Sequence, residues 1–314
     1  MPCTASAKSL RRARPVRRAV RDSARWARFN SIPDVSHRAL IAGASSAVLA
    51  IGLVGCGSSS SSSVDTTNGP FALPPEAGHV HGIAPRPAGG IVVGTHGGLY
   101  AAGSDGALAR VGDSADYMGL AALPPAALLS SGHPGPESDE PNPLGLRRSD
   151  DGGATWTRID SVPRDDYHVI EAGGGRVYAV GSDGATYAGA APTALAKVGQ
   201  APEGLIDLAA HPTRGTSVVA TTQSGMRRSG DGGRTWAAAG DRIGLVSWAS
   251  PAALFMVDAT GGVSMSGDGG ASWSARGSID APPAALLATS ASDLVAADHE
   301  GRIRTSDDGG RTWS

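Results

Sequence analysis

The feature that most constrains this chain is an eight-residue element, Ser-x-Asp-Gly-Gly-x-(Thr/Ser)-Trp, which recurs four times. The copies are SDDGGATW (149–156), SGDGGRTW (229–236), SGDGGASW (266–273) and SDDGGRTW (306–313). Successive copies begin 80, 37 and 40 residues apart, so the first interval spans two units of similar length. A period of about 20–50 residues is typical of repeat architectures in which each unit is one supersecondary structure.

Each copy of the element is predicted to be a tight turn. Ser and Asp side chains bond nearby backbone groups in such turns, and glycine adopts the positive φ angles that they require. The Trp is expected to pack between neighbouring sheets. The turn residues are therefore interpreted as structural: Asp151, Trp156, Asp231, Trp236, Asp268, Trp273, Asp308 and Trp313.

Apolar runs upstream of the element predict two further strands in every unit. The first-strand segments are 79–84, 116–123, 166–173, 204–211, 244–250 and 284–290, and the second-strand segments are 90–95, 126–131, 176–181, 216–221, 253–258 and 293–298. Six units of about 39 residues each match one four-stranded blade per unit. The predicted fold is all-β: a six-bladed β-propeller of four-stranded antiparallel blades.

The sixth unit lacks a segment for its outermost strand, because the sequence ends one residue after Trp313. Residues 64–78 precede the first strand of the first unit and are expected to supply that strand. Pro70, Pro74 and Pro75 would be tolerated there, because an outermost strand is an edge.

The repeated element resembles the Asp-box, or BNR repeat, of sialidase-like propellers, which also have six blades. The resemblance supports Asp-box turns between the third and fourth strands of the blades. It also raises the question of sialidase chemistry, which uses three arginines, a Tyr/Glu pair and an acid/base Asp. The Arg-Ile-Pro signature of that family is absent, and no clamp of three arginines is visible where the channel would open.

The charge of the chain is divided between two regions. Residues 1–38 carry ten Lys/Arg against two acidic residues, whereas the part after Cys56 carries 17 basic and 27 acidic residues. An acidic body argues against nucleic acid as a partner, because phosphate binding needs a basic face.

The uncharged stretch 39–55 is an apolar targeting segment that leads into Leu53-Val54-Gly55-Cys56. This sequence resembles the bacterial lipoprotein signal, in which the chain is cut before the Cys and the thiol receives a lipid. The resemblance implies a signal segment at 1–55, lipidation at Cys56, a Ser-rich tether at 56–69, a propeller at 70–314 and an extracytoplasmic, membrane-attached location. The alternative is an uncleaved membrane anchor, which leaves the domain in the same place.

Histidines gather on one face of the predicted propeller. Strands alternate in direction, so the start of a first strand and the turn after a second strand share a face, opposite the Asp-box turns. Six histidines map to that face, whereas His211 maps to the other face as an ordinary loop residue. The predicted metal ligands are His79, His81, His96, His133 and Met118. Imidazoles together with a Met thioether suggest copper or zinc. His168 and His299 are weaker candidates. The alternative is that these imidazoles only satisfy backbone groups or line a polar channel.

The same face carries a Pro-rich insertion at 132–146 with three carboxylates, Glu137, Asp139 and Glu140. They could serve as general acids and bases, as metal ligands or as solvated charges. Tyr117 and Tyr167, near the starts of first strands, are further catalytic candidates. The HxHG, THGGL and SGHP segments resemble a group of bacterial lipoproteins catalogued as glycosyl hydrolases, and the fold is also similar to photosystem assembly-factor-like propellers.

These observations predict a cell-envelope lipoprotein whose propeller binds a ligand, expected to be a transition metal, at its histidine-bearing face. Hydrolysis of an extracytoplasmic glycan is the alternative enzyme function, and a non-catalytic assembly scaffold is the second alternative. The protein is expected to be a monomer.

Overall fold

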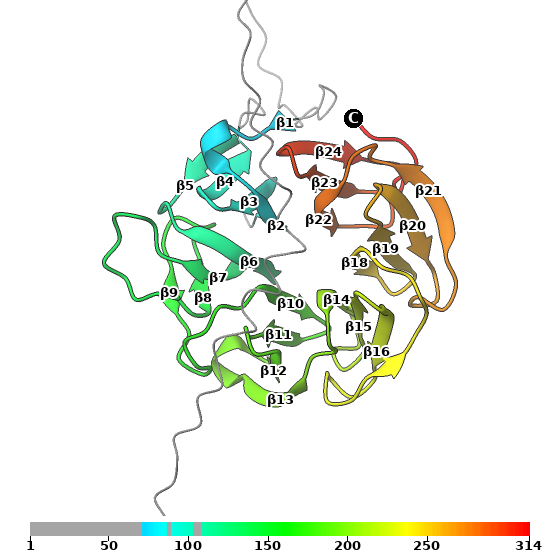
Figure 1. The fold of residues 1–314 in the computed structure, drawn as a ribbon, viewed down its shortest axis with the longest axis horizontal. Helices are drawn as coiled ribbons and strands as arrows, with labels where there is room; N and C mark the ends of the chain where they lie inside the picture. The colour runs from blue at the N-terminus through cyan, green and yellow to red at the C-terminus, as the bar shows by residue number, and fades with distance from the viewer. Residues whose placement is uncertain (1–70, 87–88, 103–107) are drawn as a thin grey trace, which may run out of the picture. The chain divides into compact units, whose positions relative to one another are not determined.

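The chain forms a ring of six four-stranded antiparallel sheets in the computed structural model (Figure 1). The structure describes residues 71–86, 89–102 and 108–314. These residues contain strands and two short 3-10 helices, and the described part has no α-helix. No helix within it is long and apolar enough to cross a membrane. The predicted signal segment, Cys56 and the tether lie outside the described residues.

The first three blades follow one another along the chain, each running from its innermost to its outermost strand. Blade one comprises β2 (Val80–Pro85), β3 (Ile91–Thr95), β4 (Gly98–Ala102) and β5 (Leu108–Val111). Blade two comprises β6 (Asp116–Leu123), β7 (Ala127–His133), β8 (Arg147–Ser149) and β9 (Thr157–Arg158). Blade three comprises β10 (Val169–Gly173), β11 (Arg176–Val180), β12 (Ala185–Gly189) and β13 (Ala196–Gln200), with the 3-10 helix η2 (Pro192–Ala194) before its last strand.

The second half of the ring repeats the pattern. Blade four comprises β14 (Leu205–Ala210), β15 (Val218–Thr222), β16 (Gly225–Ser229) and β17 (Ala237–Ala238). Blade five comprises β18 (Leu245–Ser250), β19 (Ala253–Val257), β20 (Gly262–Ser266) and β21 (Ser274–Ser278). Blade six contains β22 (Pro283–Ala288), β23 (Leu294–Asp298) and β24 (Arg302–Ser306), and the first strand of each blade lies nearest the centre of the ring (Figure 1).

The N-terminal part of the propeller closes the ring. Strand β1 (Phe71–Ala72) pairs antiparallel with β24, with Phe71 opposite Ile303. The Leu73 N–H then donates to the Gly301 carbonyl at 3.0 Å. The predicted outermost strand of blade six is thus confirmed within the described residues. It is short, because Pro74 and the 3-10 helix η1 (Pro75–Ala77) follow it.

The hydrophobic core is divided into clusters that lie between adjacent blades. One cluster joins Leu99 of blade one to Tyr117 and Leu128 of blade two, and Trp156 packs against it. Trp236, Trp273 and Trp313 contact the corresponding clusters farther round the ring. The expected role of these tryptophans in packing between sheets is confirmed.

The four repeated turns share one pattern of hydrogen bonds to their Ser and Asp side chains, and three of them, all but the copy that contains Trp236, add a bond from the Trp indole. In the first copy, the Gly153 N–H donates to Ser149 Oγ at 2.8 Å, and the backbone N–H and hydroxyl of Thr155 donate to the two carboxylate oxygens of Asp151 at 2.9 and 2.6 Å. The Trp156 indole N–H donates to the Gly153 carbonyl at 3.1 Å. The Asp side chain is saturated by its own turn, as a structural role requires.

Bulges interrupt several first strands on the side that carries the histidines. The pairing of β2 with β3 shifts between Val80 and Gly82, and the pairing of β6 with β7 shifts between Asp116 and Gly119. A bulge changes the direction of the side chains next to it.

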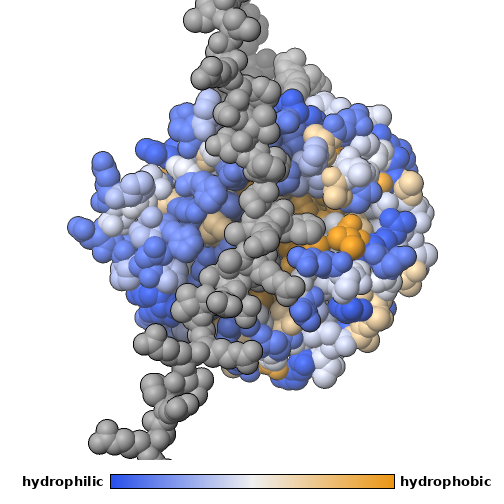
Figure 2. All heavy atoms as spheres, viewed as in Figure 1, coloured by the Kyte–Doolittle hydropathy of each residue, from blue (hydrophilic) through white to orange (hydrophobic). Residues whose placement is uncertain are grey.

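In the view of Figure 2, hydrophilic residues predominate over blades one and two, whereas apolar residues gather right of the centre near β18 and β22.

Candidate functional site

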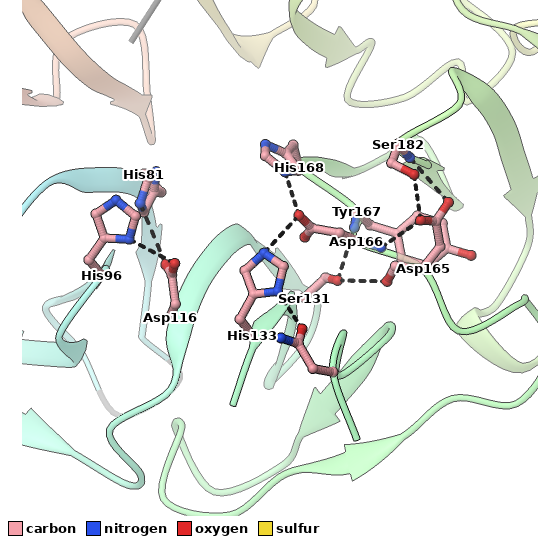
Figure 3. A network of polar contacts seen from close by, with 11 residues as sticks. His81, His96, Asp116, Ser131, His133, Asp165, Asp166, Tyr167, His168 and Ser182 are labelled. Carbon is pink, nitrogen blue, oxygen red and sulfur yellow. Dashed lines mark hydrogen bonds and ion pairs between the residues drawn. The ribbon is translucent and has the colours of Figure 1, made fainter. Parts of the chain in front are cut away.

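Two histidines and one aspartate from blades one and two converge where the first strands begin. His96 Nδ1 lies 2.7 Å from Asp116 Oδ2, and His81 Nε2 lies 3.6 Å from Asp116 Oδ1. One ligand atom from each residue can be chosen so that all three lie within 4.8 Å of one another. Figure 3 shows both imidazoles pointing toward the same carboxylate. We call His81, His96 and Asp116 the first cluster.

The backbone positions two members of the first cluster, His96 and Asp116. His96 lies in the turn between β3 and β4, and its N–H donates to the His79 carbonyl at 3.1 Å. Asp116 begins β6 beside Gly132 of β7. A Cβ atom added to Gly132 would lie 1.9 Å from the Asp116 carbonyl oxygen. Only glycine fits at position 132, so this close approach of the two backbones depends on it.

Burial sets the protonation state of His81. Its side chain is 8% exposed and that of Asp116 is 17% exposed. Burial lowers the pKa of His81 to about 4, in spite of the nearby Asp116 charge, so the imidazole is neutral at pH 7 and keeps a lone pair. Within the described residues, His81 Nε2 and Asp116 Oδ1 have no hydrogen-bond partner. Buried polar atoms are rarely left in that state, and a bound cation would satisfy both.

Of the remaining predicted ligands, His79 lies next to the first cluster. His79 is exposed, and its ring centre lies 5.6 Å from that of His96, while the rings of His81 and His96 are 4.4 Å apart. His299 of blade six has a lowered pKa, mainly through burial and next through its electrostatic interaction with His79. Met118 is partly buried beyond the first residues of β6. The cluster contains Asp116 instead, a carboxylate that the sequence analysis did not select.

A second cluster lies beside the first. His133, predicted as a ligand, places Nε2 at 3.2 Å from Asp166 Oδ2, and His168 places Nε2 at 2.5 Å from the same oxygen. His133 therefore meets His168 rather than the other predicted ligands. Asp116 and Asp166 both begin an Asp-Tyr pair at a predicted first strand, which was the available signal for them.

The insertion at 132–146 reaches this face through Asn142, whose side-chain oxygen lies 2.7 Å from His133 Nδ1. Glu137, Asp139 and Glu140 are all exposed. Glu140 lies 3.9 Å from the buried guanidinium of Arg147, which also pairs with Asp113. The three loop carboxylates are therefore exposed charges, and none of them belongs to a buried carboxylate pair.

The two tyrosines among the catalytic candidates are fully buried in the core. The Tyr117 hydroxyl donates to Asp113 Oδ1 at 2.6 Å, and the Tyr167 hydroxyl donates to the Pro163 carbonyl at 2.9 Å. Burial raises the pKa of both phenols. A buried, protonated phenol is suited to packing, so the structure gives neither tyrosine a position open to a ligand.

His211, interpreted from the sequence as an ordinary loop residue, is buried in its turn. It is 2% exposed, its Nδ1 accepts the N–H groups of Thr213 and Arg214 at 3.2 Å, and its ring lies against Trp248. His211 is therefore a structural residue of the turn after β14, which agrees with its place outside the histidine clusters.

The fold and the clusters together define a six-bladed β-propeller with histidine–carboxylate groups where the first strands of blades one to three begin. No protein-family model matches the sequence, and no curated protein matches it either. Solved structures do share the fold.

A GH74 xyloglucanase from Xanthomonas campestris is 17% identical, with a TM-score of 0.53 over 76% of this chain and 45% of its own. The chain therefore spans less than half of that enzyme. A gluconolactonase from the same organism gives a TM-score of 0.58 at 12% identity, covering 73% of this chain and 86% of its own. A structure of YCF48 bound to D1 peptide gives 0.52 at 17% identity, covering 79% and 84%. These likenesses show the fold alone.

Proposed function

We propose that this protein binds a divalent transition-metal ion at His81, His96 and Asp116, on the face of the propeller where the first strands begin. The observation that carries the proposal is the convergence of one ligand atom from each residue within 4.8 Å. Two buried atoms of the same cluster, His81 Nε2 and Asp116 Oδ1, have no hydrogen-bond partner in the described part. Neutral imidazole and ionised carboxylate are the forms that bind metals, and the low pKa of His81 keeps its imidazole neutral.

The donor set favours zinc or a similar ion. Two imidazole nitrogens and one carboxylate oxygen suit Zn²⁺, which takes these ligands at about 2.0–2.2 Å. Copper remains the expectation if Met118 joins the site, because a thioether favours copper. Three protein ligands leave a position open for water or another ligand. A metal held in this way can bind an oxygen ligand or polarise it.

Metal binding is tested on the purified full chain after removal of metals with a chelator. We expect Zn²⁺ and Co²⁺ to bind near neutral pH, and His81→Ala and His96→Ala to weaken this binding at least tenfold. His299→Ala is the matched control, because it removes a partly buried histidine of the same face outside the cluster. Isothermal titration measures the affinity. Wild-type affinity in both cluster variants would contradict the proposal.

Hydrolysis of a glycan is the second candidate function. Asn142 joins the carboxylate-bearing insertion to His133, so acidic groups and histidines share one face. Two of the similar solved structures are a xyloglucanase and a gluconolactonase. Sugar release from a glycan panel, abolished by Glu137→Gln or Glu140→Gln, would support this function. A chain that releases no sugar and takes up no metal would leave an assembly scaffold as the remaining candidate.

We also propose that Cys56 carries a lipid that anchors the propeller to the outer side of a bacterial cell membrane. The support is the Leu53-Val54-Gly55-Cys56 sequence, in which Cys56 directly follows an uncharged segment of 17 residues, 39–55. In a bacterial host, a labelled fatty acid is expected to be incorporated into the wild-type chain, and Cys56→Ala is expected to abolish incorporation. Cys3→Ala serves as the control, since Cys3 belongs to the segment that cleavage would remove.

A further inference from the structure

A bulge interrupts the first strand of four blades close to its beginning. The pairing with the second strand shifts between Val80 and Gly82 in blade one, Asp116 and Gly119 in blade two, Leu205 and Asp207 in blade four, and Pro283 and Ala285 in blade six. Bulges are common beside binding sites, because they change the direction of a side chain. The same position of the four blades therefore presents a side chain whose direction a bulge determines.

The residue inside this bulge is a proposed metal ligand in one blade and apolar in the other three. Blade one has His81, a member of the first cluster. The corresponding residues are Met118 in blade two, Ile206 in blade four and Ala284 in blade six, and all three are partly exposed. Blades two and six are the neighbours of blade one in the ring (Figure 1). The histidine is therefore followed on both sides by blades whose bulges carry apolar side chains.

Apolar contacts lead directly from His81 to blade six. Val80, the residue before His81, belongs to a buried cluster with Ala285 of β22, and Ala284 and Leu287 pack against that cluster. Both of these side chains remain partly exposed. Apolar residues near β18 and β22 are also visible in Figure 2. The first cluster thus has polar ligand atoms on the side of blade two and an apolar surface on the side of blade six.

Polar side chains on the innermost strands of blades four and five are already engaged with neighbouring backbone. Ser247 Oγ of β18 accepts the Ala288 N–H of β22 at 2.9 Å. Asp207 Oδ2 of β14 accepts the Val246 N–H of β18 at 2.8 Å. These bonds join one blade to the next. A ligand on this part of the ring would therefore meet mainly apolar side chains.

We propose that the ligand of this face is an amphipathic acid, whose oxygen head binds the ion at the first cluster and whose apolar chain packs against Ala284 and Leu287. The inference rests on the metal site proposed above and adds the class of molecule that the site accepts. Three protein ligands leave a position for an oxygen donor on Zn²⁺. Sites for small molecules are commonly apolar with a few polar groups that fix the orientation, which is the arrangement found here.

A series of straight-chain carboxylates tests the inference on the zinc-loaded full chain. Isothermal titration measures the affinities for acetate, butyrate, hexanoate and octanoate. We expect the affinity to rise with chain length and octanoate to bind at least about tenfold more tightly than acetate, because each buried methylene strengthens binding about fourfold. The chelator-treated chain is expected to bind octanoate at least about tenfold more weakly, because the carboxylate then lacks the ion.

Variants locate the apolar chain on blade six. Ala284→Asn and Leu287→Asn are each expected to reduce the preference for octanoate over acetate to about threefold or less, while the affinity for Zn²⁺ stays unchanged. Leu123→Asn is the matched control, because Leu123 is a partly buried apolar residue at the far end of β6. Circular dichroism checks the folding of each variant, and the chain-length series itself needs no variant.

The outcomes separate this inference from the metal site. Zinc binding with equal affinities for acetate and octanoate would overturn the amphipathic ligand and leave the metal site. No zinc binding by the wild type would overturn both. Octanoate that binds equally well to the chelator-treated chain would show that the ion does not hold the head. A preference that survives in Ala284→Asn and Leu287→Asn but is lost in Leu123→Asn would place the chain elsewhere and contradict the inference.

Discussion

At the scale of single residues, aspartate side chains serve two different purposes in this molecule. Asp151 lies in a repeated turn, where it accepts hydrogen bonds from the hydroxyl and the N–H of Thr155. Asp116 lies at a bulge, where one of its oxygens has no such donor among the described residues. The first carboxylate is committed to its own loop, whereas the second is available to a cation.

The turn aspartates make the stability of the protein sensitive to acid. Hydrogen bonds from Thr155 lower the pKa of Asp151 from 3.8 to about 2, and the pKa values of Asp231, Asp268 and Asp308 are lowered in the same way. A lowered pKa contributes stability above the unfolded value, and this is lost as the pH falls through the folded value. We therefore expect the urea midpoint to fall between about pH 4 and pH 2.

Unfolding curves of Asp151→Asn measure how much of this acid dependence comes from one turn. The variant is expected to be less stable at pH 7 and to lose less stability on acidification. Asp150→Asn is the control, because the Asp150 carboxylate pairs with Arg148 rather than with the turn backbone. Equal acid dependence in wild type and Asp151→Asn would show that the turn carboxylate does not contribute.

At the scale of strands and turns, the short strand β1 has a role out of proportion to its length. Phe71 is partly buried and packs with Leu73 against a cluster that contains Val93 and Ile303. Its pairing with β24 completes the sheet of blade six. Without β1, the outer side of β24 would be an unpaired edge, which is a site for unwanted association.

Phe71→Ala is expected to lower the free energy of unfolding by roughly 1–2 kcal/mol, since it removes a partly buried aromatic side chain. Ala72→Ser is the matched control in the same strand, because Ala72 is exposed. Chemical denaturation measures both changes. A Phe71→Ala variant as stable as the wild type would mean that β1 contributes no packing energy to the closure.

Strands marked by an apolar run between turn residues were predictable from the sequence. The segment predicted at 116–123 is β6 to the residue, because its apolar run and flanking turns define both ends. The first strand of blade three was placed at 166–173, but it begins at Val169. Asp165 explains the difference. Its carboxylate accepts hydrogen bonds from Ser182, and these bonds hold the chain just before Val169 in a loop.

The candidate site was predictable only in part, for a related reason. The alternation of strand direction predicts that the histidines share one face. This prediction requires only the positions of the strands, which the sequence repeat supplies. Which imidazole meets which carboxylate depends on bulges and on the path of residues 163–168, and these have no periodic signal. Asp116 and Asp166 therefore resembled ordinary residues at the start of a strand.

At the scale of the whole molecule, two acidic side chains lie on the innermost strands and bind the next blade. Glu171 Oε1 on β10 accepts the Ala210 N–H at 3.4 Å, and Asp207 Oδ2 on β14 accepts the Val246 N–H at 2.8 Å. Each carboxylate thus links one blade to its neighbour. Burial is the main cause that raises the pKa of Glu171 to about 8 and that of Asp207 to about 6.

The raised pKa of Glu171 predicts a pH dependence opposite to that of the turns. Between an unfolded pKa near 4.5 and the folded value of about 8, the folded protein holds a proton that the unfolded chain has lost. Stability therefore falls as the pH rises through this range. Glu171→Gln is expected to exceed the wild type by about 1–3 kcal/mol at pH 8 and to match it near pH 4. Denaturation at the two pH values measures this, and a difference that does not change with pH would contradict it.

The closure of the ring also imposes an order on biosynthesis. Strand β1 leaves the ribosome before every other strand of the propeller, yet its partner β24 is the last one made. At about 5–20 residues per second, translation of the chain from Phe71 to Ile303 takes roughly 10–50 s. Throughout this interval β1 has no partner strand, wherever the chain folds. The outer edge of blade six therefore cannot be covered until β24 is available.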